Sequence, residues 1–271
     1  MPHTNRLFYM IILLTAMSHV TADLYLPSFY AIMQELNTDD SFVQMSMSLF
    51  MFGFAISQLI YGPLSDALGR RPPLIAGLIL CLTGSLICCY ASSIEMLNIG
   101  RFVQGLGVGS ATVLGRAIMR DCFSGNRLIR YFSYLGSTVI IVMASAPLVG
   151  GYIQQFFDWR MNFAFLAFYT MLVLIGTYFL IPETHKNPSV EYIKISHFIN
   201  SAKTILLNKE FIGYTCCLAL AYAGFLIWLS AGTILLEKGM RIGPIGVGWL
   251  IFTEGVFYAI GAWINIRVVE N

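Results

Sequence analysis

The chain has 271 residues, of which 57% are hydrophobic and only 11% are charged, and its formal net charge is +2. A soluble domain carries about 25% charged residues, so the composition excludes a water-soluble globular protein and favours a membrane protein. The small net charge and the lack of a basic tract with interleaved aromatic residues give no indication of nucleic-acid binding. The six cysteines form no C-x-x-C pair and have no histidine cluster beside them, so we expect neither disulfides nor a metal site.

Eight apolar segments reach the ~20 residues that a helix needs to cross the hydrocarbon core. They cover residues 7 to about 33, 42–64, 73–91, 96–119, 131–153, 162–181, 211–236 and 246–266. The first segment could pass for a signal peptide, but its apolar run continues well past the small-residue pattern at 20–22, so an uncleaved helix is the better interpretation. We therefore expect an all-α, polytopic membrane protein.

Basic residues are distributed unevenly over the loops between these segments. When the loops are assigned alternately to two sides, most of the sixteen Lys and Arg residues fall on the side that holds the N-terminus. The positive-inside rule then places both termini in the cytoplasm. The longest hydrophilic break, 182–210, contains apolar residues at three- and four-residue spacing with lysines nearby, which favours an amphipathic helix on the inner leaflet over a solvated linker.

A short charged segment separates the second and third apolar segments. Residues 62–74 read Gly-Pro-Leu-Ser-Asp-Ala-Leu-Gly-Arg-Arg-Pro-Pro-Leu. The glycines and prolines should end one helix, turn the chain and start the next helix on Pro73. The spacing of Gly62, Asp66 and Gly69-Arg70-Arg71 resembles the loop signature of the major facilitator superfamily. The resemblance implies a cytoplasmic gating loop, joined by Arg120 and Asp121 from the end of the fourth segment.

Four further stretches sharpen this resemblance: the first and fourth resemble the bicyclomycin and chloramphenicol resistance (Bcr/CflA) branch of drug:proton antiporters, the second an element of the whole superfamily, and the third the antiporter element. They are DLYLP at 23–27, RFVQGLG at 101–107, APLVGG at 146–151 and WRMNF at 159–163. The third departs from the family element, which has glycine where this chain has Ala146. The four stretches occur in the order of the family and cover the N-terminal two thirds of the chain.

The layout of the segments also resembles that family, whose two six-helix halves enclose a central cavity. We expect a six-helix transmembrane half at 1–181, a cytoplasmic linker at 182–210 and the first two helices of a second half at 211–271. The family has six helices in the second half, so we interpret the chain as truncated after the eighth span. A non-transporting membrane remnant or subunit therefore stays open as an alternative.

Three ionisable residues inside the apolar segments are candidates for proton coupling. Asp23 would carry the proton, because a carboxyl that is loaded on one side and released on the other couples a proton gradient to a conformational change; a wetted position near the outer mouth is the alternative. His19, one turn earlier, could share the proton or simply pack. Arg101 stays charged when buried; it would tune the proton on Asp23 or tie helices together through carbonyls. Glu254, in the eighth segment, has no assigned role.

Small residues and a proline in the fourth and fifth segments predict close, bendable helix contacts. The residues are Gly105, Gly109, Pro147, Gly150 and Gly151. By position alone, five others could line a cavity for apolar compounds, although a core or lipid-facing position is the usual one for such residues: Tyr25, Phe29, Met51, Phe54 and Gln104.

The resemblance implies a proton-coupled secondary transporter that exports drug-like small molecules from the cytoplasm across the bacterial inner membrane by alternating access. Its partners would be the substrate, protons and the lipid bilayer, and the oligomeric state is left open. Export of a metabolite or siderophore is the alternative within transport. The sequence contains no P-loop pattern, so we expect no direct use of ATP. We expect neither an enzyme nor a bound cofactor.

Overall fold

The computed structural model describes residues 2–185 and 207–269, and all regular elements within these ranges are helical. Eight of the described helical segments are long and apolar enough to cross a membrane, which confirms the predicted all-α fold with eight spans. The predicted amphipathic helix falls mainly on residues 186–206, which lie outside the described residues. The elements are α1 Pro2–Asp23, η1 Leu26–Ser28, α2 Phe29–Glu35, α3 Asp40–Leu68, α4 Arg71–Cys89, α5 Ile94–Cys122, α6 Gly125–Phe156, α7 Trp159–Leu180, α9 Lys209–Ile227, η3 Trp228–Gly232, η4 Leu235–Gly239 and α10 Pro244–Val269.

The first six spans form a bundle, here called the N-terminal bundle, with α5 packed against α1, α3 and α4. Glycines of α5 allow these close approaches. A Cβ on Gly105 would overlap the backbone carbonyl of Phe50 in α3, and one on Gly109 would overlap the hydroxyl of Ser57. Helices in lipid associate through such small residues because the hydrophobic effect does not drive them together.

The first span is interrupted near its middle. The α-helix ends at Asp23, and a 3₁₀ turn at Leu26–Ser28 leads into α2. Pro27 has no N–H to donate to the carbonyl of Asp23, four residues earlier, so the α-helical hydrogen-bond pattern cannot continue there. The interruption places Asp23 at a helix end inside the membrane-spanning segment.

The turn between α3 and α4 contains fewer residues than the sequence suggests, because α3 ends at Leu68 and α4 begins at Arg71. The expectation that Gly62 and Pro63 end the helix is wrong, because α3 runs through both to Leu68. Pro63 removes a single backbone donor, whereas an apolar surrounding favours keeping the rest of the helix paired. The break is at Gly69, whose φ of +90° suits glycine, and α4 begins with prolines in its first turn. We call residues 69–70 the hinge.

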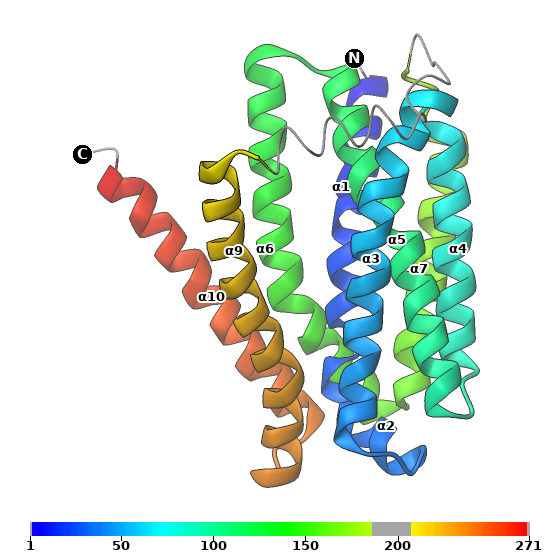
Figure 1. The fold of residues 1–271 in the computed structure, drawn as a ribbon, viewed down its shortest axis with the longest axis vertical. Helices are drawn as coiled ribbons and strands as arrows, with labels where there is room; N and C mark the ends of the chain where they lie inside the picture. Colours follow the sequence, from blue (N-terminus) through cyan, green and yellow to red (C-terminus); the bar gives the residue numbers. More distant parts are fainter. Residues whose placement is uncertain (1, 186–206, 270–271) are drawn as a thin grey trace.

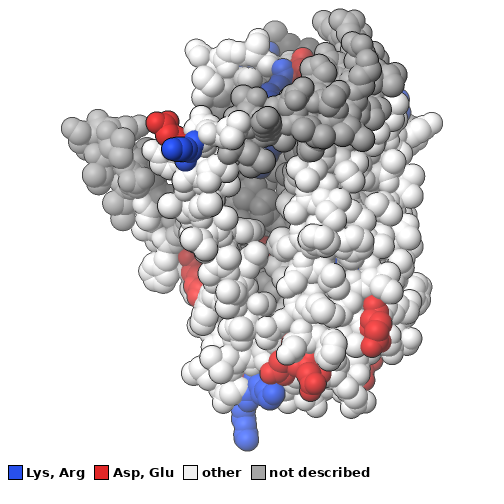
Figure 2. All heavy atoms as spheres, viewed as in Figure 1, with Lys and Arg blue, Asp and Glu red and all other residues white. Residues whose placement is uncertain are grey.

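The last two spans stand apart from the N-terminal bundle along part of their length. In Figure 1, α9 and α10 lean away from α1 and α3 at the end of the molecule that carries the hinge and approach the bundle at the opposite end, near α2. Helix α10 packs against α6 and contacts η1. Figure 2 shows few charged side chains over the middle of the molecule on the face displayed, as expected for a surface in contact with lipid. We call the two ends the hinge end and the far end.

Candidate functional site

Arg101 in α5 has no exposed surface. Its Nη1 donates to the backbone carbonyl of Thr21 at 2.9 Å and to Oε1 of Gln104 at 2.5 Å. Its Nε and Nη2 have no hydrogen-bond partner among the described residues. The guanidinium Cζ lies 4.2 Å from the ring centroid of Tyr25 and 4.1 Å from that of Phe50, and such ring faces stabilise a cation. The bundle therefore holds a positive charge between aromatic rings with spare donor capacity.

Asp23 lies two residues after the carbonyl that Arg101 binds, and its side chain is only 5% exposed. Within the described part of the chain, neither a hydrogen bond nor an ion pair reaches its carboxylate. The residues two positions before and after Asp23 both contact Arg101: Thr21 through its carbonyl and Tyr25 through its ring. A carboxyl group in this setting can exist neutral or ionised, and the balance depends on how close the guanidinium stays.

The described hydrogen bond of His19 is to a neighbour on its own helix and not to Asp23 or Arg101. His19 is half-buried on α1, with Nδ1 3.2 Å from Oγ of Ser18. His19 thus stands one turn before Asp23 on α1, and no described hydrogen bond joins its ring to Asp23 or Arg101.

The five residues proposed to line a substrate cavity fall into two sets. Tyr25, Phe29 and Gln104 have no exposed surface, and the rings of Tyr25 and Phe29 pack with centroids 5.1 Å apart. Met51 and Phe54 on α3 are partly exposed. In this conformation only the second set offers surface to a solute, while Tyr25 and Gln104 surround the guanidinium of Arg101.

Arg70 is the centre of a charged cluster at the hinge. Its Nη1 donates to Oδ1 of Asp66 at 2.5 Å, and its Nε donates to Oδ2 of Asp121 at 2.9 Å. Since Asp121 stands at the end of α5, the cluster ties the hinge to that helix. Arg71 points elsewhere, and its Nη2 donates to the backbone carbonyl of Tyr178 in α7 at 2.5 Å.

Glu183, just after α7, completes this cluster. Its Oε1 accepts from the backbone N–H of Arg70 at 2.8 Å, and its Oε2 accepts from that of Arg71 at 3.1 Å. Oε1 also accepts from the N–H groups of Thr184 and His185 at 3.0 and 2.9 Å. The first N–H groups of a helix have no partner inside it, and a negative charge is favourable there. Glu183 therefore caps the start of α4 from the segment that follows α7.

Glu183 makes the stability of the hinge depend on pH. Burial alone would raise the pKa of this carboxyl, but the backbone N–H donors outweigh it and hold the pKa below its usual 4.5. The stabilisation is therefore present above the unfolded-state pKa and is lost as the pH falls through the folded-state pKa. We expect Glu183→Gln to lower the free energy of unfolding at pH 7, because the neutral amide is a weaker acceptor for these N–H groups. The loss should be only about 1 kcal/mol, since water screens the exposed carboxylate.

Thermal unfolding of the purified protein in detergent between pH 3.5 and 7.5 checks this expectation. The difference between wild type and Glu183→Gln should shrink toward zero at the acidic end. Glu210→Gln, which makes the same change in the first turn of α9, serves as the control. A difference that stays constant over the whole pH range would contradict the assignment.

Polar contacts join η4 to the N-terminal bundle at the far end. Glu237, which is 8% exposed, accepts from the backbone N–H of Tyr30 at 3.2 Å. Lys238 pairs with Asp40 at 3.3 Å. We call these four residues the far-end contacts. They hold the far end together while the helices diverge toward the hinge end.

Small residues also allow close contacts around α6. A Cβ on Gly150 would overlap the carbonyl of Leu24, and one on Gly151 would overlap the carbonyl of Pro244 at the start of α10. Pro147 lies inside α6, and its carbonyl is among the atoms closest to Gly248 of α10. The residues chosen from the sequence as packing positions therefore lie at contacts of α6 with the first span and with α10.

Other charged residues fall outside these groups. Arg120 is exposed, and no described contact brings it into the hinge cluster. Glu254 is exposed and accepts from Nε1 of Trp228 at 3.0 and 3.1 Å. Sequence reasoning missed Glu183 and Glu237. Each stands near the end of an apolar run, where a charged residue is expected to face water, and only the fold reveals the backbone N–H groups that they accept from.

The arrangement is that of a multi-pass helical membrane protein with a buried pair of opposite charges and a charged hinge. The family model for the Major Facilitator Superfamily matches residues 11–269. The chain belongs to the major facilitator superfamily, a family of membrane transporters.

Several relatives carry drug-resistance names. A bicyclomycin resistance protein homolog of Haemophilus influenzae is 29% identical over 92% of this chain and 63% of its own length. An uncharacterized transporter of Rickettsia bellii is 32% identical over 97% of this chain and 65% of its own. Multidrug resistance protein D of Escherichia coli is 26% identical over 96% of this chain and 65% of its own. These relatives confirm the resemblance to the Bcr/CflA branch, and the chain spans just under two thirds of their length.

Solved structures share the fold at low sequence identity. A bacterial homolog of the human lysosomal transporter Spinster, in an inward-facing and unoccupied conformation, matches 99% of this chain and 63% of its own with a TM-score of 0.80 and 13% identity. A D-xylose–proton symporter matches 99% of this chain and 69% of its own with a TM-score of 0.74 and 15% identity.

Proposed function

We propose that the chain is a proton-coupled secondary transporter that exports drug-like small molecules across the bacterial inner membrane by alternating access. The observation that carries this proposal is the buried pair of Asp23 and Arg101, which lie inside membrane-spanning helices without a direct ion pair. Ionisable residues at such depth are costly and mark proton or substrate paths. The names of the bicyclomycin and multidrug resistance relatives support the substrate class.

In the proposed cycle, the proton competes with the guanidinium of Arg101 for the carboxylate of Asp23. With Asp23 ionised, Arg101 attracts it and holds α1 against α5. A proton that arrives from outside neutralises Asp23 and weakens this attraction, so α1 and the helices packed on it are free to shift. The change at Asp23 reaches α10 through α6, because Gly150 is in close contact with the carbonyl of Leu24 and Gly151 with that of Pro244.

The shape supports an inward-open state in this cycle. The far-end contacts close one end, and α9 and α10 diverge from the bundle at the hinge end. We place the hinge end and both termini in the cytoplasm by the positive-inside rule, so substrate enters there or from the inner leaflet. In this proposal residues 1–181 form one half, 182–210 the linker and 211–271 helices of the second half, which rocks against the first.

Drug accumulation in cells tests the proposal. We expect cells that express the chain to accumulate less ethidium than control cells, and a protonophore to abolish the difference. Asp23→Asn should abolish it as well, because an amide cannot bind and release the proton. Asp39→Asn, the same change at an exposed residue before α3, should leave export intact.

A second measurement follows the proton itself. Purified wild-type protein should release protons into a weakly buffered detergent solution when tetraphenylphosphonium is added, and Asp23→Asn should not. The proposal fails if both proteins reach the membrane and neither lowers ethidium accumulation. It also fails if Asp23→Asn exports ethidium and releases protons as the wild type does.

A further inference from the structure

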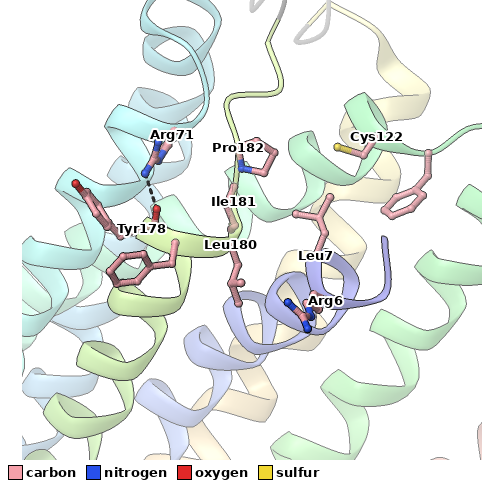
Figure 3. A pocket seen from close by; sticks show the side chains of 10 residues that line it. Arg6, Leu7, Arg71, Cys122, Tyr178, Leu180, Ile181 and Pro182 are labelled. Atoms are coloured by element: carbon pink, nitrogen blue, oxygen red, sulfur yellow. Dashed lines mark hydrogen bonds between the residues drawn. The ribbon is translucent and has the colours of Figure 1, made fainter. Parts of the chain in front are cut away.

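A cavity of about 740 Å³ opens at the hinge end of the N-terminal bundle, away from Asp23 and Arg101. The start of α1, the end of α5, the start of α4 and the end of α7 form its walls. Figure 3 shows Arg71 and Arg6 on different sides of the cavity, with Leu180 and Ile181 between them. Among the ten lining side chains, these two arginines are charged and none is acidic.

The two arginines have donor capacity left for a ligand. Arg71 is held in place by its bond to the carbonyl of Tyr178 and by the ring of that residue, 5.1 Å from its Cζ. Its Nε is buried and has no hydrogen-bond partner within the part of the chain that the structure describes. Arg6 is exposed at the start of α1.

The carboxylates next to the cavity in sequence are already engaged. Asp121 accepts from the side chain of Arg70, and Glu183 accepts from backbone N–H groups at the start of α4. Both carboxylates face the hinge, and neither is among the residues that line the cavity, whose own ionised side chains are the two arginines. An anionic group is the ligand that this charge favours.

An exposed apolar surface continues from the cavity along α1 and α7. Tyr9 and Leu13 follow Arg6 at helical spacing on one face of α1, and Tyr9 is 64% exposed. Phe179 at the end of α7 is 76% exposed. The two helices pack side by side, since the hydroxyl of Tyr169 in α7 donates to the carbonyl of Leu13 at 2.8 Å. Acyl chains can lie along this surface while a headgroup enters the cavity.

We propose that this cavity binds the phosphate headgroup of an anionic phospholipid from the leaflet at the hinge end. Arg6 and Arg71 hold the phosphate, and the acyl chains follow the exposed face of α1 and α7. Basic pockets between spanning helices bind anionic headgroups in this manner. A free phosphate ion matches the arginines but not the apolar surface, so the lipid is the occupant to which the geometry points.

Lipid binding to the purified full chain tests this inference without any transport measurement. Native mass spectrometry would compare phosphatidylglycerol with phosphatidylcholine of the same acyl chains. We expect phosphatidylglycerol to bind several-fold tighter. Arg6→Gln and Arg71→Gln should each weaken its binding about fivefold, since one basic residue near a membrane surface contributes about 1 kcal/mol. Arg127→Gln, at an exposed position near the start of α6, should leave binding unchanged.

Each competing explanation gives a different result. Equal binding of the two lipids, or equal losses in Arg6→Gln and Arg127→Gln, would overturn the lipid site and leave only general attraction to positive charge. Inorganic phosphate that displaces phosphatidylglycerol at equal concentration would assign the cavity to a free anion. If Arg71→Gln does not fold, the comparison of Arg6→Gln with Arg127→Gln decides. Failure of drug export leaves this result untouched, because binding is measured on the isolated protein.

Discussion

Replacing Gly105 by alanine is expected to destabilise the N-terminal bundle by about 2 kcal/mol or more, although alanine is the better helix former. The exchange gains about 1 kcal/mol of helix propensity, whereas inserting a methyl group into a packed contact costs about 1–3 kcal/mol and occasionally more. At Gly105 the added Cβ would overlap the backbone carbonyl of Phe50. A backbone atom cannot rotate away as a side chain can, so α3 and α5 must separate and the cost lies at the upper end.

Gly136 of α6 provides the matched comparison, because a Cβ there meets no atom within 4 Å. Gly136→Ala should keep or raise the midpoint of thermal unfolding in detergent, whereas Gly105→Ala should lower it. Equal midpoints for the two variants would show that α3 and α5 are not in close contact at this position.

Arg101→Met is expected to retain the fold and to lose proton-coupled export. The rate of export should fall roughly 10- to 100-fold, which corresponds to a coupling energy between Arg101 and Asp23 that is typical of linked sites. Methionine fills most of the space between Tyr25 and Phe50. Removing the cation relieves its desolvation cost but forfeits its contacts with the two rings and its hydrogen bonds to Thr21 and Gln104, so we expect the free energy of unfolding to fall by about 1–3 kcal/mol.

Two comparisons separate the role of the charge from the role of the volume. Arg101→Ala leaves a cavity and should lower the thermal midpoint clearly below that of Arg101→Met. Arg101→Lys keeps the charge and should retain part of the tetraphenylphosphonium-induced proton release, with a shifted pH profile. If Arg101→Met unfolds as readily as Arg101→Ala, or exports ethidium normally, then Arg101 is a structural tie between α1 and α5 and not a coupling residue.

Local features of the sequence predicted the spans and the position of the hinge well. Apolar length and the distribution of Lys and Arg are properties of short segments, so the eight spans required no knowledge of packing. The end of α3 was misplaced because Pro63 was treated as a helix breaker, although one lost hydrogen bond is tolerated in a long apolar helix. Proline is therefore a weaker indicator of a helix end in membrane helices than in helices of soluble proteins.

The partners of the charged residues could not be predicted in the same way. Arg70 lies 51 residues from Asp121 and 113 residues from Glu183, and Glu237 meets Tyr30 across 207 residues. Such pairings depend on how the helices are arranged, which the spacing of residues along one segment does not encode. The burial of Arg101 was anticipated from its place in an apolar run, but its aromatic neighbours were not.

Because the carboxylate of Glu183 caps the start of α4 from 113 residues further along the chain, the hinge cannot be completed early in biosynthesis. At about 5–20 residues per second, a ribosome needs roughly 6 to 23 s to make this stretch. During that interval the third, fourth and fifth spans enter the membrane while the first N–H groups of α4 rely on water. The hinge reaches its final form only when the sixth span has left the translocation channel, so its assembly reports that the whole N-terminal bundle has been inserted.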